Sequence, residues 1–275
     1  MYCDLHTHSN FSDGTCSPAR LIAEARRLGL TAVALTDHNT VAGLPDFVAA
    51  GQGSGVEAVP GCEFSADYQD MELHILGLWI EPAHYATVTA LLEQAQREKE
   101  RSNRDLVSAL NANGYQLDYG EICGKCAGQI NRAHIAAAMV EKGYFATMQE
   151  AFKGPLSEKQ GLYKRPKRID AYACIRFIKS IGAVAVLAHP LLTLDEAALR
   201  AFLPEAVEAG LDGLEVAYSK YSAETTAAAF AVADDFGLKY SGGSDFHGDN
   251  KPEIALGTGR GTLKIPTQWL EALKK

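Results

Sequence analysis

The sequence lacks any long apolar segment. No stretch approaches the roughly 18 consecutive apolar residues that a membrane-spanning helix needs. The N-terminus also lacks the basic segment and apolar core of a secretory signal. Internal repeats and low-complexity tracts are absent too, which argues against disorder, collagen and coiled coil. We therefore expect a globular cytoplasmic protein that is neither secreted nor inserted in a membrane.

Cysteine is scarce for a chain of this length and does not follow a disulfide pattern. The six cysteines are scattered over 275 residues, several of them inside apolar stretches. Reduced thiols are the simplest interpretation. Cys123 and Cys126 form a single CxxC without a partner pair, which favours a solvated loop over a zinc site.

An excess of basic charge is missing as well. The chain has 26 Lys and Arg against 34 Asp and Glu, a formal net charge of −8. Binding of long nucleic acid or anionic lipid rests on many Lys and Arg contacts, so a broadly basic surface for either is excluded. The charge is uneven, however, because residues 97–168 hold 13 basic and 8 acidic residues, a local charge of +5.

Short apolar runs alternate with amphipathic segments, which is typical of βαβ units and a mainly parallel sheet. Ser17 and Pro18 predict the start of a helix over 19–28. A long polar helix is expected over 83–113, followed by helical pieces without a convincing strand. We expect three segments: a first barrel part at 1–96, a helical insertion acting as a substrate cap at 97–168, and a second barrel part at 169–275. The strands are expected at 2–5, 31–36, 57–64, 73–79, 183–188, 213–216 and 239–242.

Most of the eight histidines directly follow a predicted strand. His6 and His8 come after the first strand, His38 after the second, His189 and His247 after later ones. Polar residues at the ends of many different strands favour a (β/α) barrel over a doubly wound sheet. His84 does not fit this pattern and is expected to be a plain surface residue.

The strand-end residues have the types and spacings of metal ligands. Residues two apart on an extended chain point to the same side, so His6 and His8 could chelate one ion, and so could Asp245 and His247. Other candidates are Glu63 and His74 on strands and Asp13 in a loop. A single ion cannot use nine ligands, so the set predicts two or three ions bridged by a carboxylate such as Glu63. The predicted ligands are His6, His8, Asp13, His38, Glu63, His74, His189, Asp245 and His247.

These residues form a series of motifs that resembles the PHP (polymerase and histidinol phosphatase) domain family. The motifs stand in family order along nearly the whole chain: His6-Thr-His8, Ser12-Asp13-Gly14, Leu35-Thr-Asp-His38, Pro60-Gly-Cys-Glu63, His74, Ala188-His-Pro190 and Gly243-Ser-Asp-Phe-His247. The resemblance implies a distorted (β/α)7 barrel with a metal centre that hydrolyses phosphate esters. It also implies three ligand groups: His6, His8, Glu63 and Asp245; Glu63, His74 and His189; Asp13, His38 and His247.

The predicted insertion contains a second resemblance. Arg132-Ala-His134-Ile-Ala is similar to the Arg-Pro-His-Ile-Ala segment of a bacterial branch that acts on nucleoside 3',5'-bisphosphates and on the 5' ends of short RNA, with Ala133 in place of Pro. Basic residues in this region independently suggest phosphate binding. The candidate phosphate contacts are Arg132, His134, Lys164, Arg165, Lys167 and Arg168.

The resulting hypothesis is a metal-dependent phosphoesterase that removes the 3'-phosphate from a substrate such as adenosine 3',5'-bisphosphate. The nucleophile is expected to be a metal-activated water, with His247 as a candidate proton donor. Mn²⁺ is preferred as the ion, with Zn²⁺ and Fe²⁺ as alternatives. Two enzymatic alternatives are a 5'–3' exonuclease on short RNA and a histidinol-phosphate-type phosphatase.

A non-enzymatic alternative is a metal-stabilised PHP scaffold module. The expected partners are a small nucleotide or a short RNA end, with no long duplex, no membrane and no obligate protein partner.

Overall fold

The computed structural model describes residues 1–125, 130, 132–157, 162–166 and 168–275. Contacts divide the chain into two compact units, and each is described here by itself. Unit 1 comprises Met1–Ala90 and Ile169–Lys275, and unit 2 comprises Leu91–Arg168. Every residue of unit 1 is described. Unit 2 begins at Leu91, whereas the predicted insertion begins at residue 97. Both positions lie inside one continuous helix, α3.

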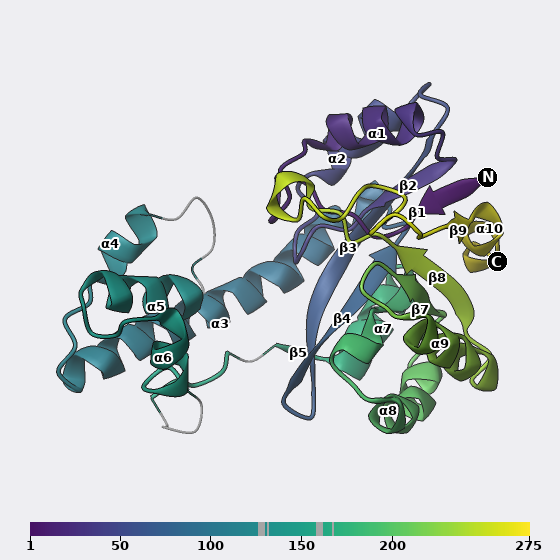
Figure 1. Ribbon diagram of the computed structural model, residues 1–275. Coiled ribbons are helices and arrows are strands. Elements are labelled where there is room, and N and C mark those ends of the chain that lie inside the picture. The colour runs from purple at the N-terminus through teal and green to yellow at the C-terminus, as the bar shows by residue number, and fades with distance from the viewer. Residues whose placement is uncertain (126–129, 131, 158–161, 167) are drawn as a thin grey trace. The chain divides into compact units, whose positions relative to one another are not determined.

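The strands of unit 1 form one nearly closed sheet in the order β8-β7-β6-β4-β3-β2-β1-β9, with β5 paired to β3 (Figure 1). The backbone nitrogen of Leu5 donates to the Gly242 carbonyl at 3.2 Å, which links the end of β1 to β8. The predicted α/β barrel is thus confirmed. The strands are β1 (Tyr2–Asp4), β2 (Ala32–Leu35), β3 (Glu57–Tyr68), β4 (Met71–Leu78), β5 (Ile169–Asp170), β6 (Val184–Ala188), β7 (Gly213–Tyr218), β8 (Lys239–Gly243) and β9 (Ile265–Pro266).

Helices connect most of these strands. The predicted helix start at Ser17 and Pro18 is confirmed, since the Ser17 side chain accepts from the Arg20 nitrogen and Pro18 is the first helical residue. The helices of unit 1 are α1 (Pro18–Arg27), α2 (Leu44–Gly51), α7 (Ala171–Ser180), α8 (Glu196–Glu208), α9 (Ala223–Asp235) and α10 (Thr267–Leu273), with 3₁₀ turns η1 (Pro82–His84), η3 (Pro190–Leu192) and η4 (Gly248–Asn250). His84 ends η1 and is half-buried.

The sheet differs from the expected parallel arrangement at β4, which runs antiparallel to both β3 and β6. β3 and β4 extend beyond their predicted ends to form a hairpin. Its turn residues Gln69 and Asp70 both have positive φ, 47° and 64°, as a tight hairpin turn requires. Residues 69 and 70 are Gln-Asp rather than the usual Asn-Gly or Asp-Gly of such a turn, so the sequence pattern does not predict the hairpin.

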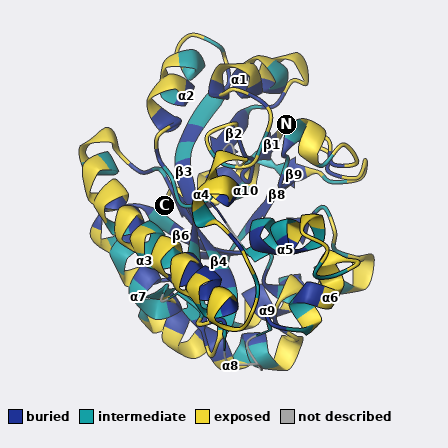
Figure 2. Ribbon diagram, turned by 90° about the vertical axis from the view of Figure 1, so that its left-hand side faces the viewer, coloured by how far each residue is buried: buried dark blue, intermediate teal, exposed yellow. Residues whose placement is uncertain are grey.

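The interior of the barrel is filled by small and branched side chains from many strands. Leu5, Ala34, Val59, Leu76 and Val186 belong to one buried cluster. Figure 2 shows the strands as mainly buried and the outward sides of the helices as exposed. This packing holds the carboxyl ends of β1 and β8 together at the position of the predicted ligands.

Unit 2 is helical and has a hydrophobic core of its own. It contains the part of α3 (Tyr85–Ala112) from Leu91 onward, and α4 (Tyr119–Gly124), α5 (Arg132–Glu141) and α6 (Met148–Lys153). Leu106, Leu110, Ile135 and Met139 are among its buried core residues. In the described part of the chain, no helix is long and apolar enough to cross a membrane.

Gly243, the last residue of β8, allows the closest backbone approach to the predicted ligands. A Cβ atom at this position would lie 2.2 Å from the His6 Cβ and 2.6 Å from the His6 nitrogen. We expect Gly243→Ala to lower the free energy of unfolding by about 3 kcal/mol, because backbone atoms cannot move aside cheaply. Chemical denaturation would measure the change.

The control is Gly124→Ala in α4, where nothing lies within 4 Å of the added Cβ. That variant should be neutral within about 0.5 kcal/mol. Equal stability of the two variants would show that the backbone at Gly243 can accommodate a Cβ atom beside His6 at no cost.

Candidate metal centre

All nine predicted ligands lie together in unit 1, two of them within β3 and β4 and the others in segments that follow strands. Glu63 on β3 is central and has no exposed surface. Its two oxygens lie 2.7 to 3.3 Å from imidazole nitrogens of five histidines: His6, His8, His38, His74 and His189. One carboxylate therefore contacts side chains that follow three different strands, β1, β2 and β6, and one side chain of β4.

A second carboxylate and a third complete the cluster. Asp245 Oδ1 is 3.2 Å from His8 Nε2 and 3.4 Å from His247 Nδ1. Asp13 Oδ1 is 3.2 Å from His247 Nε2, and Asp13 Oδ2 is 3.8 Å from His38 Nε2. Asp13 is half exposed, whereas His247 is fully buried, so this side of the cluster opens to solvent.

The cluster leaves buried polar atoms without hydrogen bonds. Six such atoms in fully described unit 1 belong to predicted ligands: His6 Nε2, His8 Nδ1, His8 Nε2, Glu63 Oε2, His74 Nδ1 and His247 Nε2. Buried polar atoms normally find a partner, since leaving one unsatisfied costs about 1–3 kcal/mol. These nitrogen and oxygen atoms face one another without hydrogen bonds, which is the arrangement expected of atoms that bind metal ions.

The donor atoms form overlapping groups of metal-binding size. Within each group all the atoms lie within 4.8 Å of one another. The grouping agrees with the predicted one only in part. His38 stands in place of His189 beside Glu63 and His74, His8 joins the group of Asp13, and Asp245 belongs to none of these groups. The groups are His8, Asp13, His38 and His247; His6, His8 and Glu63; His38, Glu63 and His74; and His6, His189 and Glu215.

Burial and charge shift the pKa values inside the cluster. Burial alone would raise the pKa of Glu63, but His74, His38 and His6 hold it well below its usual value. Burial likewise opposes a charged His74, yet the charge of Glu63 raises the His74 pKa to about 10. Burial lowers the pKa of His8 to about 3. His8 is therefore neutral and able to donate a lone pair, whereas His74 must lose a proton to bind an ion.

Two further buried carboxylates hold the loops that carry the ligands. Asp4 accepts from the Ser244 nitrogen, the Ser244 hydroxyl and the Gly257 nitrogen, at 2.6 to 2.8 Å. Asp37 accepts from the Ser9 nitrogen at 2.7 Å and from the Ser12 hydroxyl at 2.5 Å. These bonds fix the chain beside His6, His8 and Asp245 independently of any ion.

Backbone strain is concentrated at the same place. Asn39, His189 and Asp245 have positive φ values of 50°, 29° and 57° although none is glycine. Such conformations cost of order 1–3 kcal/mol each and persist where the surrounding structure imposes them. In this protein they turn the chain sharply at three strand ends that carry predicted ligands.

The sequence patterns missed Glu215, which lies in β7 and is fully buried. Its Oε1 atom is 3.2 Å from His6 Nδ1, and its Oε2 atom accepts from the His189 nitrogen at 2.7 Å. Because a carboxylate only accepts, this contact places the proton of His6 on Nδ1 and leaves Nε2 with its lone pair facing Glu63. An acidic residue inside an otherwise apolar strand was the available signal.

The predicted phosphate contacts lie in unit 2. Arg132 is the first residue of α5, and its guanidinium lies over the Tyr163 ring at 4.0 Å and bonds the Leu156 carbonyl at 3.4 Å. His134 lines a cavity of about 360 Å³ between α4 and α5. Lys164 is exposed, and Arg165 and Arg168 are half-buried. Lys167 lies outside the described residues, as does Cys126 of the CxxC.

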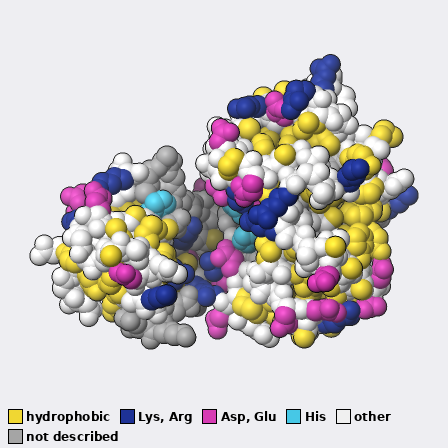
Figure 3. Space-filling view, viewed as in Figure 1, with side chains coloured by type: hydrophobic (Ala, Val, Ile, Leu, Met, Phe, Trp, Pro, Cys, Tyr) yellow, Lys and Arg dark blue, Asp and Glu magenta, His cyan; other side chains and the backbone are white. Residues whose placement is uncertain are grey.

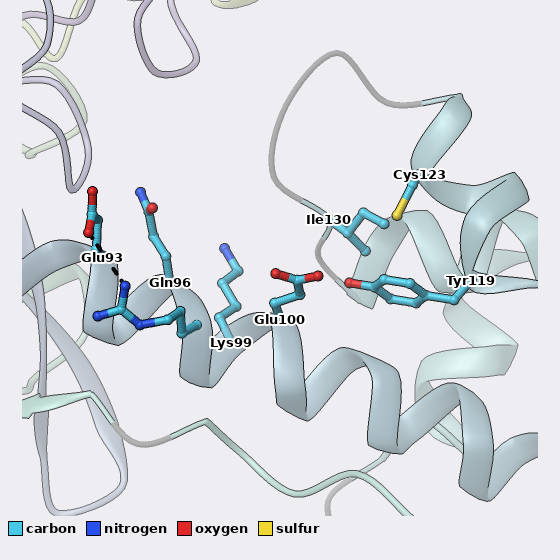
Figure 4. A pocket seen from close by; sticks show the side chains of 8 residues that line it. Glu93, Gln96, Lys99, Glu100, Tyr119, Cys123 and Ile130 are labelled. Carbon is cyan, nitrogen blue, oxygen red and sulfur yellow. Dashed lines mark hydrogen bonds and ion pairs between the residues drawn. The ribbon is translucent and has the colours of Figure 1, made fainter.

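Unit 2 has another cavity, of about 370 Å³, between α3 and α4. Figure 4 shows Gln96, Lys99 and Glu100 pointing into it from α3, with Tyr119, Cys123 and Ile130 opposite. It contains none of the predicted phosphate contacts. The cysteines Cys3, Cys16, Cys62, Cys123 and Cys174 are free thiols.

Comparison with known proteins gives the family. The model of the PHP domain matches residues 4–158, so the chain belongs to the PHP domain family. It is 30% identical to a 5'-3' exoribonuclease of Haemophilus influenzae over 89% of each chain. It is 31% identical to a phosphoribosyl 1,2-cyclic phosphate 1,2-diphosphodiesterase of Eggerthella lenta, covering 90% of this chain and 95% of that one.

A third relative and one solved structure agree with this assignment. The chain is 30% identical to a 3',5'-nucleoside bisphosphate phosphatase of Chromobacterium violaceum, covering 89% of this chain and 86% of that one. A crystal structure from Bifidobacterium adolescentis, assigned as a metal-dependent phosphoesterase, superposes with a TM-score of 0.74 at 28% identity, covering 98% of this chain and 94% of that one. The relatives are thus enzymes that cleave phosphate esters, and the expectation of a phosphoesterase rather than a scaffold is confirmed.

The role of Glu215 can be tested by substitution. We expect Glu215→Gln to weaken divalent-metal binding by roughly tenfold, because a neutral amide oxygen accepts from His6 more weakly than a carboxylate does. Glu215→Ala should weaken it by up to roughly 100-fold, because His6 then loses the acceptor that orients it. Calorimetric titration of metal-free protein with Mn²⁺ measures the affinity. Glu208→Gln, an exposed position on α8, is the matched control and should bind as the wild type does. Wild-type affinity in Glu215→Ala would contradict the proposed orientation.

Proposed function

We propose that the protein removes the 3'-phosphate from nucleoside 3',5'-bisphosphates and requires divalent metal ions to do so. The observation that carries the proposal is the cluster of six histidines and three carboxylates, in which six buried nitrogen and oxygen atoms face one another without hydrogen bonds. Relatives named for a bisphosphate phosphatase and an exoribonuclease support the choice of substrate class.

The nine predicted ligands would hold two or three ions, with Glu63 shared between them. Divalent ions at such a site neutralise charge on phosphoryl oxygens and lower the pKa of water. The donors are imidazole and carboxylate, and no cysteine belongs to any group of described residues. A mixed nitrogen and oxygen set without thiolate suits Mn²⁺, our first choice, and also Fe²⁺ or Zn²⁺.

The residues of the cluster have separable tasks. His6 and His8 offer Nε2 atoms beside Glu63, while Asp245 Oδ1 faces both rings. His247 Nδ1 lies 2.8 Å from the Asp245 carbonyl oxygen, which only accepts, so its proton is on Nδ1 and its Nε2 lone pair faces Asp13. This arrangement favours His247 as a ligand over His247 as the proton donor for the leaving oxygen.

The second phosphate of the substrate would bind to unit 2 through Arg132 and His134, with Lys164 and Arg165 as further candidates. The local charge of +5 over residues 97–168 supports an anion site there, against −13 for the rest of the chain. Lys and Arg side chains are interspersed with acidic and apolar ones on the face drawn in Figure 3. Such a surface suits a mononucleotide or a short RNA end rather than a long duplex.

Exonuclease action on short 5'-phosphorylated RNA is the second proposal, since three exoribonuclease relatives are 30–31% identical to this chain. Both substrates combine a 5'-phosphate with a scissile 3'-ester. Histidinol phosphate has a single phosphate and gives no role to a second anion site.

Removal of metal is the first test. Protein treated with a chelator should lose phosphoesterase activity, because the donors lose their cations. Mn²⁺ should restore the activity more fully than Zn²⁺ or Mg²⁺, because Mn²⁺ is our first choice for this mixed nitrogen and oxygen donor set. Activity and bound metal would be measured on the same samples, with circular dichroism as a control for folding. Full activity in metal-free protein would contradict the proposal.

Substrate choice is the second test. Adenosine 3',5'-bisphosphate should give the highest kcat/KM among four substrates, the others being 5'-phosphorylated RNA trimers, a ribose 1,2-cyclic phosphate and histidinol phosphate. Arg132→Met should raise KM for the bisphosphate roughly 10- to 100-fold, because a charge-assisted bond to the second phosphate is lost.

The matched control is Arg97→Met, which removes an exposed arginine paired with Glu93 on α3. It should leave KM unchanged. Faster turnover of the RNA trimers would favour the exonuclease, and an unchanged KM in Arg132→Met would remove Arg132 from the substrate site.

A further inference from the structure

The two oxygens of Asp245 face different surroundings. Oδ1 points toward His6, His8 and His247, as a ligand oxygen would. Oδ2 accepts from the Tyr218 hydroxyl at 2.8 Å and from Lys251 Nζ at 3.0 Å. A lysine ammonium therefore lies beside the candidate metal centre, on the outer side of one of its carboxylates.

The position of Lys251 is fixed by the turn that precedes it. The η4 turn is tied to the loop that carries Asp13: the Asn250 side chain donates to the Asp13 carbonyl at 2.8 Å, and the Asp249 nitrogen donates to the Thr15 hydroxyl at 2.9 Å. The Lys251 nitrogen then donates to the Gly248 carbonyl at 3.1 Å. These bonds hold Lys251 between Asp245 and the loop of Asp13.

Electrostatics argues against a role for Lys251 in holding cations. A positive charge 3.0 Å from a ligand carboxylate competes with a divalent ion for the same negative charge and lowers the affinity for it. Tyr218 already gives Asp245 Oδ2 a neutral donor without this cost. A lysine at this place is instead favourable when an anion binds beside the ions.

We propose that Lys251 Nζ binds a phosphoryl oxygen of the substrate at the metal centre. An ammonium has three donors, and Asp245 uses one of them. The side chain is 29% exposed, on the half-open side of the cluster where Asp13 is 55% exposed. Within unit 1, all of which is described, no other lysine or arginine pairs with a predicted ligand. The inference rests on the proposed phosphoesterase function and adds a contact to the scissile phosphate.

The test separates binding of phosphate from binding of metal. Lys251→Met and Lys251→Arg would be compared with wild type by calorimetric titration of Mn²⁺, by titration of inorganic phosphate into Mn²⁺-loaded protein, and by kcat and KM. We expect Lys251→Met to weaken phosphate binding roughly 10- to 100-fold and to raise KM similarly, while Mn²⁺ affinity stays equal or rises. Lys251→Arg should recover part of the phosphate affinity because it keeps the charge.

The matched control is Lys179→Met, which removes another half-buried pair of a lysine and an aspartate. Lys179 lies 2.7 Å from Asp212, which precedes the start of β7, whereas Tyr218 ends β7 beside Asp245. It should change stability without changing phosphate affinity. Two outcomes would overturn the inference: phosphate affinity in Lys251→Met within twofold of wild type, or a loss of Mn²⁺ affinity as large as the loss of phosphate affinity, which would make Lys251 a positioning residue for Asp245.

The phosphate titration also keeps this inference distinct from the proposed function. If wild-type protein hydrolyses none of the four substrates, the proposed function fails, and the titration still decides whether Lys251 binds an anion. If wild type is active and Lys251→Met matches it in KM and phosphate affinity, the inference alone fails.

Discussion

The structure of the site depends on one buried charge, the carboxylate of Glu63. It has no exposed surface and lies against five imidazoles. A carboxylate buried this way is costly unless positive charge or hydrogen bonds compensate it. Here the compensation comes from side chains at the carboxyl ends of several strands, and those strands must close into a barrel to bring them together. The sheet, its closure at Gly243 and the inner carboxylates Asp4 and Asp37 all serve this requirement.

The fold was predictable where local chemistry determines it. The start of α1 at Ser17 and Pro18 follows from capping, and the buried strands follow from short apolar runs. The hairpin of β3 and β4 was not predictable, because Gln69 and Asp70 adopt positive φ only under the constraint of strand pairing. The two-residue strands β5 and β9 are also defined by their partners, β3 and β1, rather than by any pattern of their own.

The site was predictable to the extent that function leaves a pattern along the chain. Histidines at the ends of successive strands stand out. The structure brings eight of the nine predicted residues into groups of metal-binding size, and it places the ninth, Asp245, 3.2 Å from His8. Glu215 and Lys251 leave no such pattern: one is a single acid in a strand, the other a single lysine in a turn. Their importance comes from distances across the barrel, to His6 and to Asp245, which only the folded chain defines.

The arrangement of charges explains how an acidic protein can act on an anion. The carboxylates Glu63, Asp245 and Asp13 would help to hold divalent cations, which would supply positive charge beside a phosphate. Asp4 and Asp37 hold the ligand loops through hydrogen bonds from the backbone and from serines. The same strand ends carry the strained backbone of Asn39, His189 and Asp245, which the surrounding barrel holds in place. The negative net charge of the chain therefore does not exclude an anionic substrate, because a phosphate would contact the cations held by these three carboxylates rather than the carboxylates themselves.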